Sequence, residues 1–126
     1  MRLITGGAYQ GKRTYAASRW LLAANEIQDC AEWNVEDFSQ AVCVYRFHLW
    51  IKAQAAAERD IHAQIEEIVK TNPDIIIIVD EVGSGIVPMD PSERQWREAV
   101  GRAACFLAER AESVERVVCG YGVKIK

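Results

Sequence analysis

One short segment near the amino terminus carries residues suited to binding an anion. Residues 6–12 read Gly-Gly-Ala-Tyr-Gln-Gly-Lys, which fits the P-loop pattern of glycine, four variable residues, glycine and lysine. Glycines let backbone N–H groups point at one anion, and the amino end of a following helix adds its positive dipole. The residues that we expect to hold the phosphates of a nucleotide are Gly6, Gly7, Ala8, Tyr9, Gln10, Gly11, Lys12, Arg13 and Thr14.

The residue after Lys12 departs from this pattern. The pattern has serine or threonine there, with a hydroxyl that binds Mg²⁺, whereas this sequence has Arg13. A guanidinium cannot ligate a cation, and Thr14 points about 100° further around the helix. We therefore expect phosphate binding with weakened Mg²⁺ binding, and we assign no metal ligands. The alternative is a glycine turn before an ordinary helix.

Two carboxylates follow the most apolar run of the chain. Residues 75–79 are four isoleucines and a valine, which is typical of a central parallel strand covered on both faces. Asp80 and Glu81 come next, at the strand end where α/β folds bind ligands. Beside a P-loop, Asp80 can bind Mg²⁺ through water and Glu81 can orient a nucleophile. We expect Lys12, Asp80 and Glu81 to be catalytic; for Asp80, capping of the loop amides is an equally good role.

Strand and helix signals alternate along the chain. Strands are expected at residues 2–5, 41–47, 75–79 and 114–119, with an exposed edge strand at 123–126. Helices are expected at 12–24, along a long stretch that Asn72-Pro73 ends, and from an amino cap at Asp90 onward. Residues 25–40 are expected to form a loop with one helical turn. This order predicts one domain over residues 1–126, a three-layer α/β fold with a mainly parallel sheet.

Composition excludes several classes of function. The 126 residues include 15 basic and 18 acidic side chains, so no cationic field recruits nucleic acid or anionic lipid. No apolar run approaches the length of a membrane span, and the first residues lack a secretory signal, so we expect a cytoplasmic protein. The four cysteines form no close pairs and are expected to be thiols, with Cys43 and Cys119 buried in apolar strands.

Residues 80–88 carry the most specific motif. Their sequence, Asp-Glu-Val-Gly-Ser-Gly-Ile-Val-Pro, resembles the N-E-V-G-x-G-I-V-P motif of the bifunctional adenosylcobinamide kinase/adenosylcobinamide-phosphate guanylyltransferases. The similarity continues through Arg94 and residues 96–98 to the lysine-ended tail, and residues 6–12 are similar to the family's G-G-x-x-S-G-K-S loop. This resemblance implies a RecA-like P-loop nucleotide-binding fold and a homotrimer. It implies that ATP or GTP phosphorylates a corrinoid hydroxyl, and that GMP is then transferred through a guanylylated histidine. By matching positions, Gly6, Gly11 and Lys12 would hold nucleotide phosphates and Glu81 would lie at the active site.

The departures from the family pattern concern the metal and the nucleophile. Family members carry an extra strand and a histidine-bearing helical segment in the interval occupied here by residues 25–40, which contain no histidine. His48 is expected at a strand–helix junction, and His62 on a helix surface. Tyr45 stands where a strand-end carboxylate is common. We therefore expect a shortened, divergent family member that has lost guanylyl transfer. A non-catalytic nucleotide-binding, regulatory or structural homologue is the alternative, favoured if Arg13 pairs with Asp80 or Glu81.

Overall fold

A mainly parallel sheet organises the chain, and the computed structural model describes residues 1–82 and 90–126 of it. The strand order is β2-β3-β4-β1-β5-β6, and β6 alone runs antiparallel to its neighbour. The strands are β1 (Arg2–Gly6), β2 (Ile27–Asp29), β3 (Cys43–Tyr45), β4 (Ile76–Asp80), β5 (Ser113–Val118) and β6 (Tyr121–Lys124). The helices are α1 (Lys12–Trp20), α2 (Phe47–Ala56), α3 (Ile61–Thr71) and α4 (Pro91–Arg110), with 3-10 turns η1 (Ala24–Glu26) and η2 (Val35–Gln40).

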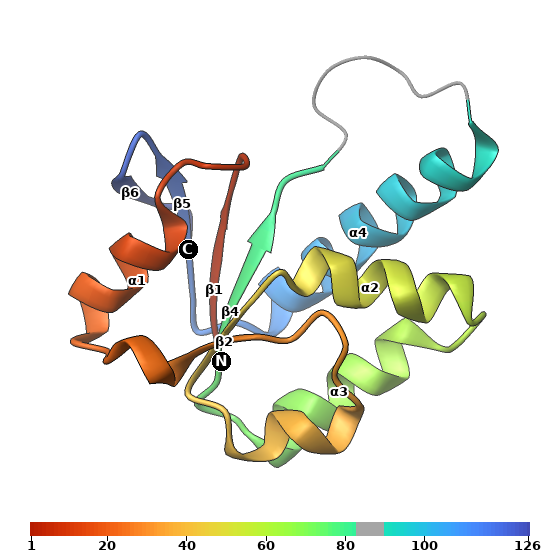
Figure 1. The fold of residues 1–126 in the computed structure, drawn as a ribbon, viewed down its shortest axis with the longest axis horizontal. Coiled ribbons are helices and arrows are strands. Elements are labelled where there is room, and N and C mark those ends of the chain that lie inside the picture. Colours follow the sequence, from red (N-terminus) through yellow and green to blue (C-terminus); the bar gives the residue numbers. More distant parts are fainter. Residues whose placement is uncertain (83–89) are drawn as a thin grey trace.

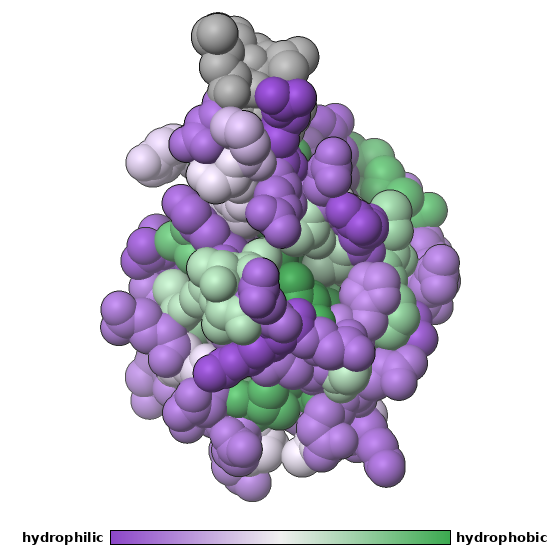
Figure 2. Space-filling model, turned by 90° about the vertical axis from the view of Figure 1, so that its right-hand side faces the viewer, coloured by the Kyte–Doolittle hydropathy of each residue, from purple (hydrophilic) through white to green (hydrophobic). Residues whose placement is uncertain are grey.

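Helices cover both faces of the sheet, as the three-layer prediction requires (Figure 1). Side chains alternate along each strand, so Leu3 and Ile77 point to the face covered by α2, α3 and α4. Ile4 and Ile78 point to the opposite face, which α1 covers. This double cover explains why β4 is apolar along its length. The outer side of the helical layer is mostly hydrophilic, with apolar side chains visible between polar ones (Figure 2).

An aromatic cluster anchors α2 to the rest of the core. Trp50 is fully buried, stacks on Phe47 with ring centroids 4.9 Å apart, and meets Phe38 of η2 edge-on at 5.5 Å. Its indole Nε1 donates a hydrogen bond to the carbonyl oxygen of Trp33 at 3.0 Å. Buried indole N–H groups need such a partner. The cluster therefore fixes the first turn of α2, which lies next to the carboxyl end of β3.

The structure corrects the sequence prediction between residues 21 and 60. Residues 27–29 form a parallel strand beside β3, where only a loop was predicted. The predicted strand at 41–47 is shorter, because Arg46 takes a positive φ of 62° and α2 begins directly after it. The predicted long helix is two helices, since Glu58 has a positive φ of 56° and Asp60 caps α3 by accepting from the Ala63 N–H. Predictions of secondary structure depend on the periodicity of apolar residues, and a single residue with a positive φ does not change that periodicity. The sequence pattern therefore could not show where these elements end.

The thiols are free, and one of them is placed differently from the prediction. Cys43 is buried, and burial raises the pKa of its thiol to about 12. Burial likewise raises the pKa of the Cys30 thiol, so both stay protonated. Cys119 is exposed, contrary to prediction, because it lies in the tight turn between β5 and β6 with a φ of 51°. Within residues 1–82 and 90–126, no helix is long and apolar enough to cross a membrane.

Candidate functional site

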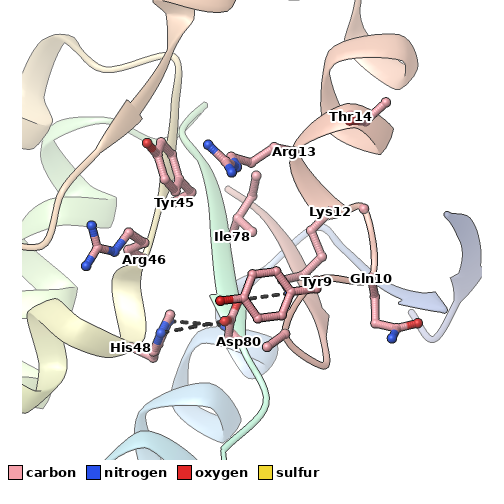
Figure 3. A pocket seen from close by; sticks show the side chains of 12 residues that line it. Tyr9, Gln10, Lys12, Arg13, Thr14, Tyr45, Arg46, His48, Ile78 and Asp80 are labelled. Carbon is pink, nitrogen blue, oxygen red and sulfur yellow. Dashed lines mark hydrogen bonds and ion pairs between the residues drawn. The ribbon is translucent and has the colours of Figure 1, made fainter. Parts of the chain in front are cut away.

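A cavity of about 550 Å³ opens at the carboxyl ends of β1, β3 and β4 (Figure 3). β1 and β4 are parallel neighbours, with Gly6 opposite Asp80, so the loop after β1 lies beside the end of β4. The residues lining the cavity are Ala8, Tyr9, Gln10, Gly11, Lys12, Arg13, Thr14, Tyr45, Arg46, His48, Ile78 and Asp80. Of the predicted phosphate-binding residues, all but Gly6 and Gly7 line this cavity.

Two positions of the glycine loop, Gly6 and Gly11, have backbone conformations that favour glycine. Gly11 precedes α1 with a φ of +89°, a conformation that side chains rarely adopt. Gly6 has a φ of +149°, and a Cβ there would lie 2.5 Å from the carbonyl oxygen of Val117. The lack of a side chain at Gly6 therefore allows the end of β1, where the loop begins, to pass close to β5.

The turn between β5 and β6 braces the middle of the loop. The Cys119 N–H donates to Oε1 of Gln10 at 2.7 Å, and the Gly120 N–H donates to the Gln10 carbonyl oxygen at 2.8 Å. Tyr9, next to Gln10, is fully exposed and has a positive φ of 60°. The loop is thus held through the backbone and side chain of Gln10, while the Tyr9 side chain stays in solvent at the cavity mouth.

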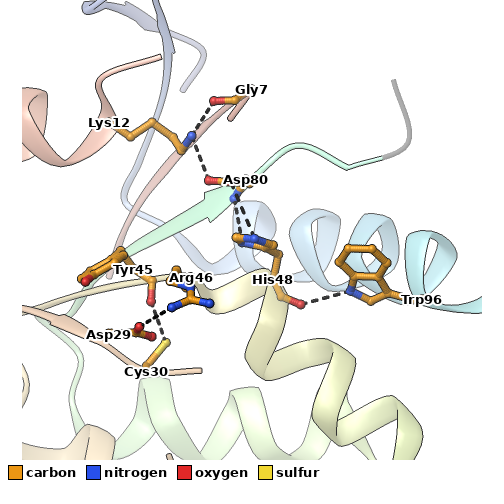
Figure 4. Close-up of polar contacts among 9 residues, drawn as sticks. All are labelled: Gly7, Lys12, Asp29, Cys30, Tyr45, Arg46, His48, Asp80 and Trp96. Carbon is orange, nitrogen blue, oxygen red and sulfur yellow. Dashed lines mark hydrogen bonds and ion pairs between the residues drawn. The ribbon is translucent and has the colours of Figure 1, made fainter. Parts of the chain in front are cut away.

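Lys12 lies at the base of the cavity and links the loop to β4 (Figure 4). Its Nζ is 2.8 Å from Oδ1 of Asp80 and donates to the carbonyl oxygen of Gly7 at 2.6 Å. The Lys12 side chain is only 6% exposed. A buried ammonium is tolerated when it is paired and hydrogen-bonded, and Asp80 supplies that pairing.

Glu81, which the sequence predicts to be catalytic, is not among the described residues that line the cavity. Its carboxylate accepts two hydrogen bonds from Arg116 of β5, at 2.7 Å from Nε and 3.1 Å from Nη2. Its backbone N–H donates to the Gly6 carbonyl oxygen at 2.9 Å. The structure therefore brings Lys12 and Asp80 together and leaves the Glu81 side chain engaged with Arg116. Most of the motif at residues 80–88 lies outside the described residues.

His48, in the first turn of α2, is a cavity residue that sequence analysis missed. Its Nδ1 accepts a long hydrogen bond of 3.4 Å from the Asp80 N–H, and its Nε2 is 3.6 Å from Oδ2 of Asp80. The Trp96 indole donates to the His48 carbonyl oxygen at 3.2 Å. An Nδ1 that accepts leaves the proton of a neutral ring on Nε2. The sequence does contain a signal that could have placed His48 at the cavity. His48 closely follows β3, and the carboxyl ends of parallel strands lie at one edge of the sheet, where α/β folds bind ligands.

Burial keeps the His48 ring neutral. Desolvation lowers the pKa of His48 below its ordinary value; the Lys12 and Arg46 charges lower it further, and those of Asp80 and Asp29 oppose the shift. A histidine with a lowered pKa in the folded state takes up protons more readily when unfolded. Keeping His48 buried and neutral therefore costs no free energy of unfolding above the unfolded-state pKa, near 6.5. As the pH falls below that value, the unfolded state binds the proton first and the free energy of unfolding decreases.

We expect the free energy of unfolding to fall with decreasing pH below about 6.5 more steeply in the natural protein than in His48→Gln. Glutamine keeps a polar side chain there but does not titrate. Urea denaturation of both proteins between about pH 5 and pH 8 measures the difference. The matched control is His62→Gln, because His62 is exposed on α3 and stacks on Phe106. Parallel pH curves for the natural protein and His48→Gln would contradict a buried neutral His48.

Arg13 faces the cavity from the first turn of α1. Its guanidinium lies 4.4 Å from the ring centroid of Tyr45, which extends from β3. Among the described residues Arg13 forms no ion pair with Asp80 or Glu81. The pairing that would favour a non-catalytic homologue is therefore not seen there. Arg46 also lines the cavity, but its Nη1 pairs with Oδ2 of Asp29 at 2.7 Å.

The side chains present are poor ligands for a divalent cation. Asp80 is the one carboxylate among the described lining residues, and its oxygens face Lys12 and His48. In the part of the chain that the structure describes, no group of three or more histidine, cysteine or carboxylate side chains could hold a metal ion. Mg²⁺ prefers oxygen ligands in octahedral geometry, and a guanidinium beside it would repel it. The donor set here fits an anion better than Mg²⁺.

Comparison with known proteins identifies relatives of the chain. Residues 21–125 match the family described as cobinamide kinase / cobinamide phosphate guanyltransferase. The bifunctional adenosylcobalamin biosynthesis protein CobU of Escherichia coli K12 is 37% identical over 75 residues, which are 56% of this chain and 41% of that protein. Its namesake from Salmonella typhimurium LT2 is 38% identical over 76 residues, 57% of this chain and 42% of that protein. The matched part of the chain thus spans less than half the length of these relatives. The family match begins at residue 21, after the loop of residues 6–14. The evidence for phosphate binding by that loop is therefore its sequence pattern and its geometry, not the family match.

Proposed function

The chain belongs to the cobinamide kinase / cobinamide phosphate guanyltransferase family, and from this premise we propose that its cavity binds the phosphates of GTP or ATP. One observation carries the proposal: the Lys12 ammonium lies at the base of a cavity whose rim is the glycine loop and the amino end of α1. Backbone amides, helix dipole and ammonium group all favour an anion there. The names of the relatives place their activity in adenosylcobalamin biosynthesis.

The reaction that fits this site is transfer of the terminal phosphoryl group of the nucleotide to a hydroxyl group of a corrinoid. The oxygen of the corrinoid hydroxyl forms a bond to phosphorus, the bond to the nucleoside diphosphate breaks, and the hydroxyl proton leaves to a base. Such transfer depends on positioning and electrostatic stabilisation more than on covalent chemistry. Lys12 contacts the phosphates in this scheme, and the Asp80 carboxylate that Lys12 then releases is a cavity base that can accept the proton.

Guanylyl transfer is not part of the proposal, because residues 25–40 hold no histidine that could form the guanylylated intermediate. A non-catalytic nucleotide-binding or regulatory homologue is the second candidate, and one observation favours it. Asp80 is paired with Lys12, and Glu81 is held by Arg116, so neither carboxylate is free in this structure. Assembly into a homotrimer and binding of a corrinoid are further parts of the proposal, which family resemblance supports. A cytoplasmic location is also proposed, because the spacing of the four cysteines is typical of a reducing compartment.

The test is to incubate the protein with adenosylcobinamide and GTP labelled at either the γ- or the α-phosphate. We expect γ-label to appear in the corrinoid, and no α-label to remain on the denatured protein. Lys12→Ala, with its ammonium removed, serves as the inactive control. Binding of GTP without labelled corrinoid would favour the non-catalytic candidate. Covalently bound α-label would contradict the loss of guanylyl transfer.

A further inference from the structure

We propose that this cavity binds a nucleoside di- or triphosphate without a divalent cation, and that the Arg13 guanidinium contacts the phosphates in place of the metal. The inference rests on the proposed nucleotide site and adds the identity of the group that neutralises the phosphates. It concerns the position directly after the loop lysine, where the P-loop pattern has the hydroxyl that binds Mg²⁺.

The charges around the cavity leave a positive excess near Arg13. Lys12 and Asp80 neutralise each other across 2.8 Å, and Arg46 is paired with Asp29, which lies outside the lining. Arg13 is exposed, and within residues 1–82 and 90–126 it has no carboxylate partner. A cation that lines a cavity and lacks a counter-charge is available for an anionic ligand.

The contact that holds Arg13 can be exchanged for a phosphate. Its guanidinium lies over the Tyr45 ring at 4.4 Å, and in solvent such cation–π contacts are weak. Figure 3 shows the side chain extending from α1 across the cavity toward Tyr45. A guanidinium offers paired N–H donors whose planar geometry matches two phosphate oxygens, and it stays charged at any physiological pH. Arg13 can thus supply one of the two positive charges that an Mg²⁺ ion would bring.

The same residues oppose metal binding at this point. An Mg²⁺ ion between the phosphates and Asp80 would share the cavity with the Lys12 ammonium and the Arg13 guanidinium. The carboxylate oxygen nearest the loop, Oδ1 of Asp80, is already 2.8 Å from Nζ of Lys12. Like charges at such short range raise the cost of bringing in a dication.

Isothermal titration of the full chain with GTP, in buffer with MgCl₂ and in buffer with EDTA, tests the inference. We expect the affinity in EDTA to lie within about threefold of that in magnesium. Arg13→Ser should weaken binding in EDTA by roughly 10- to 100-fold, and magnesium should now restore part of the affinity. Arg102→Ser is the matched control, because it removes one positive charge from the exposed side of α4, where Arg102 pairs with Glu98.

The outcomes separate this inference from the function on which it rests. Tight binding in magnesium that falls tenfold or more in EDTA would overturn the role of Arg13 and leave the nucleotide site intact. Equal affinities for Arg13→Ser and the natural protein in EDTA would also overturn it. Absence of GTP binding in both buffers would overturn the nucleotide site itself, and the inference with it. Circular dichroism of Arg13→Ser checks that an exposed substitution leaves the fold unchanged.

Discussion

Replacing Lys12 with alanine should remove most of the rise in melting temperature that GTP produces in the natural protein. A ligand at about 100 times its Kd stabilises the folded state by about 2.7 kcal/mol, which in a domain of this size is a shift of roughly 10 °C. Lys12 is the one ammonium group among the described residues that line the cavity. Without it, the phosphates lose a charge-assisted contact in a partly buried site, so their affinity should fall by roughly 100-fold.

The readout is the difference between the melting temperatures with and without GTP for each protein. Lys12→Ala also leaves Asp80 without its cation, so the melting temperature of the free variant is expected to change. The difference corrects for that change. Lys70→Ala, on the exposed side of α3, is the matched control and should keep the full shift. A shift of equal size in Lys12→Ala would show that GTP binds without this ammonium.

Replacing Trp50 with alanine should have the largest effect on stability. Its side chain is fully buried between Phe38 and Phe47, and its indole N–H is bonded to the Trp33 carbonyl oxygen. Removing such a side chain costs the transfer free energy of the ring and leaves a cavity, together about 3–5 kcal/mol. Guanidinium denaturation followed by circular dichroism measures the loss. α2 also carries His48, so the cavity at the sheet edge should loosen in the same variant.

Trp50→Phe is the companion variant for this prediction. It keeps an aromatic ring in the cluster and loses mainly the hydrogen bond to Trp33 and part of the packed volume. A loss of about 1–2 kcal/mol is expected for it. If Trp50→Ala lost less than about 1 kcal/mol, the aromatic cluster would not be the anchor of α2.

The elements that could be predicted from the sequence are those with local signals. The uninterrupted apolar run of β4 indicates a strand covered on both faces, and the structure places helices on both sides of it. Asp90 followed by Pro91 indicates the start of α4, and the Asp90 carboxylate accepts from the Ser92 N–H as an amino cap does. The glycine loop between β1 and α1 is also found where its pattern predicts. In each case the residues that decide the structure are neighbours in the chain.

The parts that sequence analysis missed depend on distant partners. β2 has three residues and little apolar pattern of its own, and it exists because it pairs with β3 at the sheet edge. Glu81 follows a central strand as predicted, but no local pattern in the sequence indicates that its carboxylate pairs with Arg116 of β5. His48 reaches the cavity because Arg46 turns the chain sharply between β3 and α2. Tertiary pairing decided the placement of β2 and Glu81, whereas a left-handed backbone turn decided that of His48.

The most direct test of phosphate capture by the glycine loop is a crystal structure of the protein grown with GTP. We expect phosphate oxygens within hydrogen-bonding distance of the backbone amides of residues 8–13 and of the Lys12 ammonium, which should have left Asp80. GTP bound at another place, with Lys12 still held by Asp80 and the Gly7 carbonyl oxygen, would contradict phosphate binding by this loop.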